Sequence, residues 1–141
     1  MTAGRLTRAQ LRHRYRPIFR GIYIPKHHRP SLWDRIEGAL LVAPGAVVAG
    51  VAASALHGAK WVDDDVDVEL IAACRPQPGL VVRREKLGEG EIITVRGLRV
   101  TSPVRTAFDL GRHLTRDMAV TRLDALMNAE TVAVVEVEPH A

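Results

Sequence analysis

Apolar and polar positions alternate at short intervals along the chain, and this predicts many short elements. Thr7 followed by Gln10 is typical of a capping box, so we expect a short helix over 8–14. The apolar residues of 18–24 alternate around an Arg-Gly step and end at Pro25. This pattern predicts a strand or a tight hairpin with a glycine bulge.

Two helices are expected in the next stretch. Ser31 stands before apolar positions at helical spacing, which predicts a capped helix that ends before Pro44. The apolar positions of this helix are Leu32, Ile36, Leu40 and Leu41. Small apolar residues between Gly50 and Gly58 predict a second, tightly packed helix over 51–57.

Strand patterns follow. Between 66 and 70, valine and leucine alternate with acidic residues, as in a half-buried strand. Residues 80–84 predict a second strand after a turn that contains proline and glycine. Residues 92–95 and 98–101 flank an Arg-Gly pair and predict a hairpin. We therefore expect a small antiparallel sheet.

Two helices are predicted toward the C-terminus. Ser102 as the cap and Pro103 at the first helical position open the first of them, and Thr115 opens the second. In the first helix the expected inner stripe is Val104, Ala107, Phe108 and Gly111, and the expected outer stripe is Arg105, Asp109, Arg112 and Arg116. The expected inward residues of the second are Ala119, Leu123, Leu126 and Met127. The predicted fold class is α+β.

Length and composition are those of one globular domain, with 141 residues of which 47% are apolar. The longest apolar stretch, 39–56, is interrupted by proline and glycine, so no membrane span is expected. The N-terminal charges have no apolar segment behind them, unlike those of a signal peptide. Cys74 is the single cysteine, which fits a reducing compartment and a cytoplasmic location.

The distribution of charge is uneven. Residues 1–30, here called the basic arm, contain eight basic side chains and no acidic one, whereas residues 31–141 carry a net charge of −4. The eight are Arg5, Arg8, Arg12, Arg14, Arg16, Arg20, Lys26 and Arg29. This asymmetry favours an anionic partner, most commonly nucleic acid. The alternative is a solvated arm in an arginine-rich protein.

Four segments of the chain carry distinctive motifs: 6–11 (LTRAQL), 19–25 (FRGIYIP), 48–61 (VAGVAASALHGAKW) and 97–110 (GLRVTSPVRTAFDL). Together they resemble a group of actinobacterial proteins whose N-terminal half is similar to the AbiEi-type antitoxins of abortive-infection toxin–antitoxin systems. The most specific is Ser-Pro-x-Arg-Thr-x-x-Asp-Leu, in which Arg105, Thr106 and Asp109 have no role that the resemblance assigns.

The resemblance implies a winged helix near the N-terminus, a following α+β domain and, in longer relatives, a C-terminal domain similar to very-short-patch-repair endonucleases. Here we expect a partial, winged-helix-like helix and hairpin in residues 1–30, an antitoxin-like domain in 31–130 and a tail in 131–141. We also expect the endonuclease-like domain to be absent. The chain would then be a stand-alone half or a truncated relative.

Nuclease chemistry of that kind is not expected. It requires an acidic residue two positions before a lysine, so that carboxylates hold the metal and the lysine positions water. The residues two positions before Lys26, Lys60 and Lys86 are Ile24, Gly58 and Arg84. No cofactor is predicted.

Other chemical patterns are weaker. Asp65 and Asp67 match the metal-binding strand of nucleotidyltransferases and could bind Mg²⁺, but a solvated acidic strand face is the more ordinary interpretation. The His27-His28 pair lacks a third ligand. Ser54 and His57 lack a paired acid, and His57 is expected to cap its helix.

The main hypothesis is a non-enzymatic, antitoxin-like regulator that binds duplex DNA weakly, with Arg8, Arg12, Arg16 and Arg20 on phosphates. The alternative is a recognition or protein-interaction half that acts through a toxin or nuclease partner, and a Mg²⁺-dependent nucleotidyltransferase is a distant third. For Arg105 and Asp109, two roles stay open. They form a helix-supporting pair, or Arg105 reaches back to strand carbonyls or to acids near Asp67.

Overall fold

The computed structural model describes residues 7–137, with side chains for all of these except Leu11 and residues 131–137. Arg5 of the basic arm and the last residues of the expected tail, 138–141, lie outside the described residues. The described part is an α+β fold, as predicted. Its helices are α1 (Arg8–Arg14), α2 (Leu32–Val42), α3 (Gly50–Leu56), α4 (Pro103–His113) and α5 (Arg116–Val137). Its strands are β1 (Tyr15–Phe19), β2 (Ile22–Pro25), β3 (Val47–Ala49), β4 (Val68–Ile71), β5 (Leu80–Arg83), β6 (Ile92–Val95) and β7 (Leu98–Thr101).

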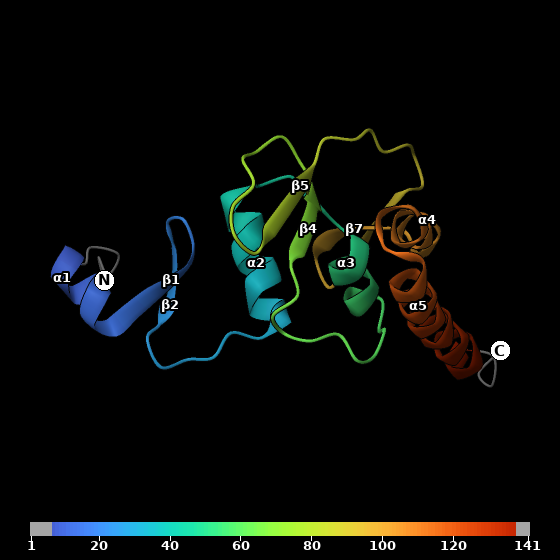
Figure 1. Cartoon of the computed structure of the whole chain (residues 1–141), viewed down its shortest axis with the longest axis horizontal. Coiled ribbons are helices and arrows are strands. Elements are labelled where there is room, and N and C mark those ends of the chain that lie inside the picture. Colours follow the sequence, from blue (N-terminus) through green and yellow to red (C-terminus); the bar gives the residue numbers. More distant parts are fainter. Residues whose placement is uncertain (1–6, 138–141) are drawn as a thin grey trace.

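A five-stranded sheet in the order β5-β4-β3-β7-β6 forms the centre of the molecule (Figure 1). The expected antiparallel pairing is found for β3 with β4 and for β6 with β7, but the sheet is mixed, because β4 pairs parallel with β5 and β3 pairs parallel with β7. The middle strand, β3, was not predicted. Its three residues are all buried, and a run this short and apolar has no alternation from which a strand can be recognised.

Helices α2 and α3 cover one face of this sheet. The core there joins Ile36 and Ala39 of α2 and Ala52 of α3 to strand residues such as Val48 and Leu70. A smaller cluster of Val47, Ala49 and Ile71 packs on Leu87 of the β5–β6 loop and on Ile92. A third cluster joins Val51 of α3, Leu110 of α4 and Leu126 of α5.

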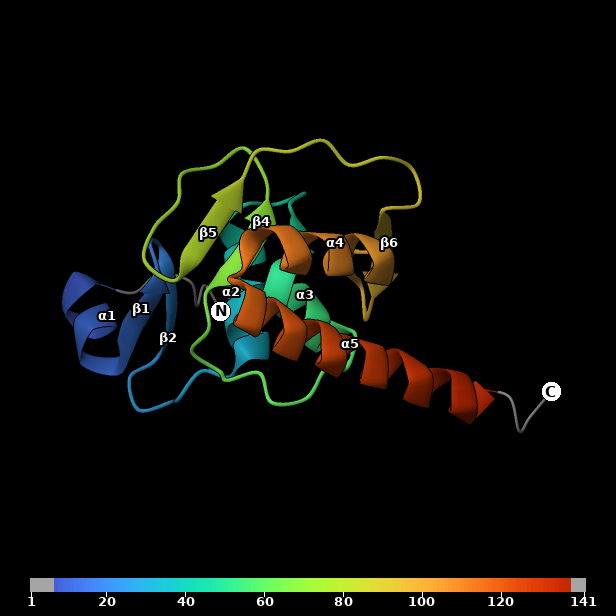
Figure 2. The same ribbon diagram turned by 45° about the vertical axis from the view of Figure 1, so that its right-hand side comes forward.

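Strands β1 and β2 form a separate two-stranded sheet, which lies with α1 at one end of the molecule (Figures 1 and 2). The predicted helix over 8–14 and the Thr7–Gln10 capping box are confirmed. The hairpin is confirmed too, with an irregular register before Phe19 and with Gly21 at φ +80° in its turn. It begins at Tyr15, earlier than expected.

The hairpin packs on α2 at Gly38, which has no side chain. A Cβ on Gly38 would lie 2.9 Å from Cδ1 of Ile18, so glycine allows the close approach. Phe19 is buried in the main core, and the backbone N–H of Arg20 donates to Oε1 of Gln77 at 2.8 Å. The basic arm is thus anchored on the α/β body by its second half.

The remaining helix boundaries follow their predicted signals. Ser31 forms a capping box with Asp34 at the start of α2, and Ser102 caps α4 with Pro103 in its first turn. Arg96 and Gly97 both have positive φ in the β6–β7 turn, as a two-residue hairpin requires. The first part of the tail expected over 131–141 is helical, because α5 continues to Val137. Valine lowers helix propensity only slightly, and no proline or glycine interrupts this segment.

The predicted faces of two helices need correction. In α4 the expected inner residues Val104 and Phe108 are 82% and 57% exposed, whereas Arg105 and Asp109 of the expected outer stripe are buried. In α5, Ala119 and Leu126 are buried as expected, but Met127 is 67% exposed. Leu41 of α2 is also 67% exposed.

Candidate nucleic-acid interface

The described cations of the basic arm lie on its surface. Arg8 and Arg12 are exposed on α1, one turn apart, while Arg16 lies on β1 and Arg20 in the β1–β2 turn. Within residues 7–137, no ion pair involves an arginine of the arm. The guanidinium of Arg16 instead donates to the backbone O of His28 at 3.0 Å. The arm therefore presents its positive charge to solvent.

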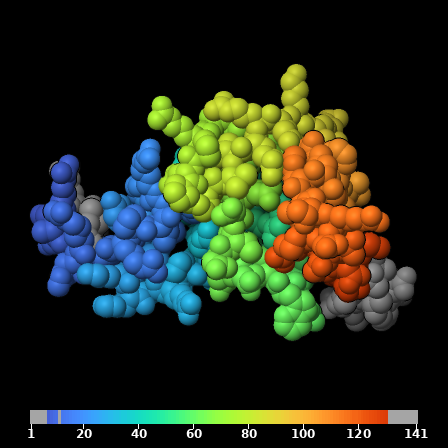
Figure 3. Space-filling view, in the orientation of Figure 1, coloured from blue at the N-terminus to red at the C-terminus, as the bar shows by residue number. Residues whose placement is uncertain are grey.

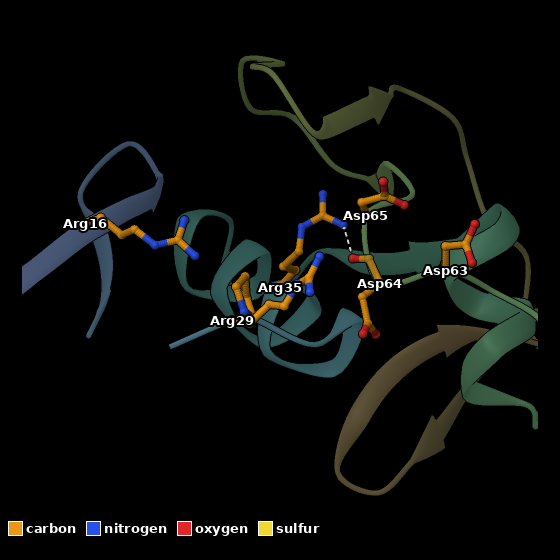
Figure 4. A pocket seen from close by; sticks show the side chains of 7 residues that line it. Arg16, Arg29, Arg35, Asp63, Asp64 and Asp65 are labelled. Carbon is orange, nitrogen blue, oxygen red and sulfur yellow. Dashed lines mark hydrogen bonds between the residues drawn. The ribbon is translucent and has the colours of Figure 1, made fainter. Parts of the chain in front are cut away.

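An open groove of about 670 Å³ lies between the arm and the α/β body. Figure 4 shows Arg16, Arg29 and Arg35 toward one side of it and the acidic turn 63–65 toward the other. Arg35 belongs to the scaffold, since it donates to the backbone O of Asp64 at 2.7 Å and of Val66 at 2.5 Å. The groove is therefore lined by both signs of charge.

The turn of 63–65 does not form the metal-binding strand considered above. β4 begins only at Val68, so Asp65 lies in a turn and Asp67 just before the strand. Both side chains are exposed, and neither belongs to any described cluster of three metal-ligating groups. Asp64 has a structural role, because its Oδ1 accepts the backbone N–H of Leu32 at 2.9 Å.

A network of ions, with Arg105 and Asp109 buried at its centre, holds α4 on the long β5–β6 loop. Nε of Arg105 donates to both carboxylate oxygens of Asp109 at 3.2 Å, so the helix pair predicted from the sequence does form. The same guanidinium donates to Glu85 at 2.5 Å and to Glu91 at 3.3 Å. Nη1 also lies 3.5 Å from the backbone O of Lys86. Arg105 does reach back to acids and a carbonyl, but those of the loop rather than those near Asp67.

Arg112 completes the network from the next turn of α4. It donates to Asp109 at 2.9 Å and also contacts Glu85. Three acids and two arginines thus share the space under α4, with side-chain exposures of only 8% for Arg105 and 2% for Asp109. Such burial is tolerable because every charge has an opposite partner.

Thr106 has a similar, uncharged role. Its fully buried hydroxyl lies 2.7 Å from that of Thr101 and donates to the backbone O of Ser102 at 2.8 Å. This contact fastens the first turn of α4 to the end of β7. The family block around Arg105, Thr106 and Asp109 is therefore a clamp between α4, β7 and the β5–β6 loop.

The network also shifts the protonation of its acids. Burial acts to raise the pKa of Glu85, but the hydrogen bond from Arg112 and the charges of Arg112 and Arg105 outweigh burial and lower this pKa below its ordinary value. The backbone N–H of Gly88, and then Arg105, lower the pKa of Glu91. Both carboxylates are therefore held in their charged form.

Glu85, Asp109 and His113 bring one ligand atom each to within 4.8 Å of one another. Nε2 of His113 is buried without a hydrogen-bond partner, and lies 3.6 Å from Oε2 of Glu85. The two carboxylates already bind Arg105 and Arg112, so a metal ion would have to displace guanidinium groups. The arrangement fits an ion-pair network better than a metal site.

The remaining predicted groups are structural. The hydroxyl of Ser54 donates to the backbone O of Val51 at 2.7 Å, and Nε2 of His57 lies 2.8 Å from the backbone O of Thr101. His57 is the C-cap residue of α3, which agrees with the predicted capping role. His28 lies 3.1 Å from the carboxylate of Asp34 in α2. No helix within the described residues is long and apolar enough to cross a membrane.

The fold and these contacts define a small α+β domain with an exposed cationic arm and a clamped C-terminal helix pair. A family model described as the AbiEi antitoxin C-terminal domain matches residues 2–141. Because this match spans nearly the whole chain, the chain belongs to that family, as its sequence motifs suggested. The match includes the basic arm as well as the α/β body. No curated protein and no solved structure matches the chain.

Some site residues could not be found from the sequence. Glu85 and Glu91 stand in a loop and have no regular spacing from Arg105, so no local pattern connects them. A weak signal did exist in α4, where charged residues recur at helical spacing within the most specific motif. That signal identified the Arg105–Asp109 pair but not the side of the helix that faces the protein.

Proposed function

We propose that this chain is a non-enzymatic, antitoxin-like protein whose basic arm binds duplex DNA through its phosphates. The observation that carries the proposal is the separation of charge. The arm contains eight basic residues and no acid, and its described arginines make no ion pair within residues 7–137. An antitoxin-like role in general follows from the family.

Two neighbouring surfaces of the arm supply the proposed phosphate contacts. Arg8 and Arg12 are one turn apart on α1, and Arg16 and Arg20 lie on the hairpin beside it. Guanidinium groups match the geometry of phosphate oxygens and form charge-assisted hydrogen bonds to them. We interpret the helix and hairpin as a partial winged helix, without a complete recognition helix to read base edges. Binding should therefore be largely independent of sequence, with Kd of about 10⁻⁴–10⁻⁶ M at physiological salt.

The acidic turn limits the direction from which DNA approaches. Asp63, Asp64 and Asp65 line the groove opposite Arg16 and Arg29. Exposed charges act over about 8–10 Å at physiological ionic strength, so a phosphate in the groove would be repelled by this turn. We infer that DNA lies along the outer side of the arm and meets Arg16 at the edge of the groove rather than inside it. Asp63→Asn with Asp65→Asn should then tighten binding at low salt.

The test is a salt titration of binding to a fluorescent DNA duplex. If about three to five phosphates are neutralised, log K should fall with log salt at a slope of about −3 to −4.5. Changing Arg8, Arg12, Arg16 and Arg20 together to Ala should flatten the slope and weaken binding to all duplex sequences alike. A matched control removes four exposed cations elsewhere, Lys60, Arg75, Arg84 and Lys86, and changes net charge equally.

The control separates a local site from a general effect of net charge. If both quadruple variants weaken binding equally, the arm has no special part in it. Absence of binding at low salt would contradict the proposal altogether. Arg105 and Arg112 are unsuitable controls, since their charges are already paired under α4.

Enzymatic activity is not part of this proposal. With Mg²⁺ or Mn²⁺ we expect no cleavage of plasmid DNA, because the carboxylate–lysine pattern of the endonuclease class is missing from the sequence. Cleavage that persists through repurification and is lost in Asp67→Ala would contradict this expectation. Thermal stabilisation by Mg²⁺ that is lost in the same variant would support the nucleotidyltransferase alternative instead.

A further inference from the structure

The outward face of α4 is apolar. Val104 is 82% exposed and Phe108 is 57% exposed, one turn apart. Gly111 continues the same stripe, and a Cβ added there would meet no atom within 4 Å. At Gly111 the backbone of α4 is therefore accessible, and another chain could approach it closely.

No described part of the domain covers this face, because α4 turns its other side to the protein. That side holds Arg105 and Asp109 in the buried ion network. Clustered apolar side chains on the surface are uncommon unless they contact a partner, whereas single ones need no explanation. Val104 and Phe108 form such a cluster together with a glycine.

The neighbouring helix α5 presents a complementary stripe. Asp117, Val120 and Asp124 recur at helical spacing on its exposed side, and Val120 is 62% exposed. Neither aspartate takes part in an ion pair with any residue of the described range. α5 thus offers an apolar side chain between two carboxylates.

Positive charge accompanies the α4 stripe. The guanidinium of Arg112 lies 4.6 Å from the centre of the Phe108 ring, and Arg116 is exposed at the junction of α4 and α5. Two α4 helices facing each other would bring these cations together. An α4 helix facing the α5 of a second copy would instead place cations beside Asp117 and Asp124, and the apolar stripe of α4 beside Val120.

We propose that this chain forms a two-fold dimer in which α4 of each copy packs on α5 of the other. Such an interface is self-complementary, since each residue pair occurs twice, and it resembles the packing of a four-helix bundle. α4 and α5 lie at the end of the molecule opposite the basic arm (Figures 1 and 3). Both arms stay free in the dimer, and the dimer does not depend on DNA binding.

The experiment measures the mass of the full chain in solution by sedimentation equilibrium across a concentration series. The unmodified chain should associate to twice its monomer mass of 15.5 kDa. Val104→Ser with Phe108→Ser should raise the dimer dissociation constant at least tenfold. The control Tyr23→Ser with Leu41→Ser removes two apolar side chains, 45% and 67% exposed, at the other end and should leave it unchanged.

A charge exchange tests which helices meet. Arg116→Asp alone and Asp124→Arg alone should each weaken self-association, because each places like charges across the interface. A mixture of the two variants should form a heterodimer, since one chain then carries only acids and the other only arginines at the two positions. Circular dichroism of each variant verifies that it is folded.

Three outcomes would overturn the dimer. The chain could remain monomeric at every concentration, its association could be unaffected by the Val104 and Phe108 changes, or the charge-exchanged mixture could fail to pair. A DNA-dependent dimer, absent without duplex, would also contradict this interface. If the chain dimerises but does not bind DNA, the result would contradict the proposed DNA binding by the basic arm and leave the dimer proposal unaffected.

Discussion

Arginine has opposite surroundings in two regions of this molecule. In the basic arm, Arg8, Arg12 and Arg20 lie at the surface with no carboxylate paired to them in the described chain. Under α4, Arg105 is surrounded by three carboxylates and has a side chain only 8% exposed. The arginines of the arm have hydrogen-bond donors available for a partner, whereas the donors of Arg105 are already bound to carboxylates within the fold.

This difference teaches that a charged side chain's role depends on its desolvation. An exposed guanidinium keeps its hydration and a long-range field, so it can attract phosphate at little cost in stability. A buried guanidinium has lost its hydration and requires every partner in place. The following changes test whether the two regions differ in this way.

The largest effect is expected from Asp109→Ala. This change leaves Arg105 buried without its most buried counter-charge, and we expect a loss of about 3–5 kcal/mol in the free energy of unfolding. Urea denaturation followed by circular dichroism measures it. Glu37→Ala, at an exposed position of α2 outside the ion network, is the matched control and should cost less than about 0.5 kcal/mol. Equal losses in the two variants would mean that the ion network contributes little.

The orientation of α4 predicts a contrast between two neighbouring residues. Leu110 is 1% exposed, so Leu110→Ala should cost about 2–5 kcal/mol. Phe108→Ala should cost less than about 1 kcal/mol, because its ring is already largely in solvent. Denaturation at high dilution, where a dimer would dissociate, gives both values. A loss above about 3 kcal/mol for Phe108→Ala would restore the inner stripe predicted from the sequence.

Acid should weaken the network specifically. The folded protein holds the pKa of Glu85 and Glu91 below the ordinary value of 4.5. Their contribution to stability is therefore complete above about pH 4.5 and is lost as the pH falls through the lower, folded-state values. Glu85→Gln should flatten this dependence in a pH series of urea denaturation. Glu89→Gln, in the same loop, should leave the slope as it is.

The smallest effect on stability per substituted residue is expected from the basic arm. Changing Arg8, Arg12, Arg16 and Arg20 together to Ala should alter the free energy of unfolding by about 0.5 kcal/mol or less per residue, since all four are exposed. The same variant should lose most of its DNA affinity. If unfolding is instead destabilised as strongly as in Asp109→Ala, the arm arginines are structural.

Local sequence signals located most of the elements of this fold. Capping residues such as Thr7, Ser31 and Ser102 mark helix starts because their side chains bond to free backbone N–H groups. The Arg96-Gly97 turn follows from the positive φ that its hairpin requires. β3 escaped prediction because a strand buried on both faces shows no alternation.

The sequence by itself determined the α+β class, the cationic arm, the Arg105–Asp109 pair and the family, since each depends on residues close together along the chain. Only the tertiary structure decided which face of α4 turns inward. Apolar spacing alone favours burying Val104 and Phe108. Glu85 and Glu91, brought by a loop fourteen to twenty residues away, satisfy the charges of α4 and so make the charged face the buried one. Counter-charges that come from a distant part of the chain do not appear in any local pattern. In α4 they outweigh the apolar spacing, which by itself predicts the opposite face to be buried.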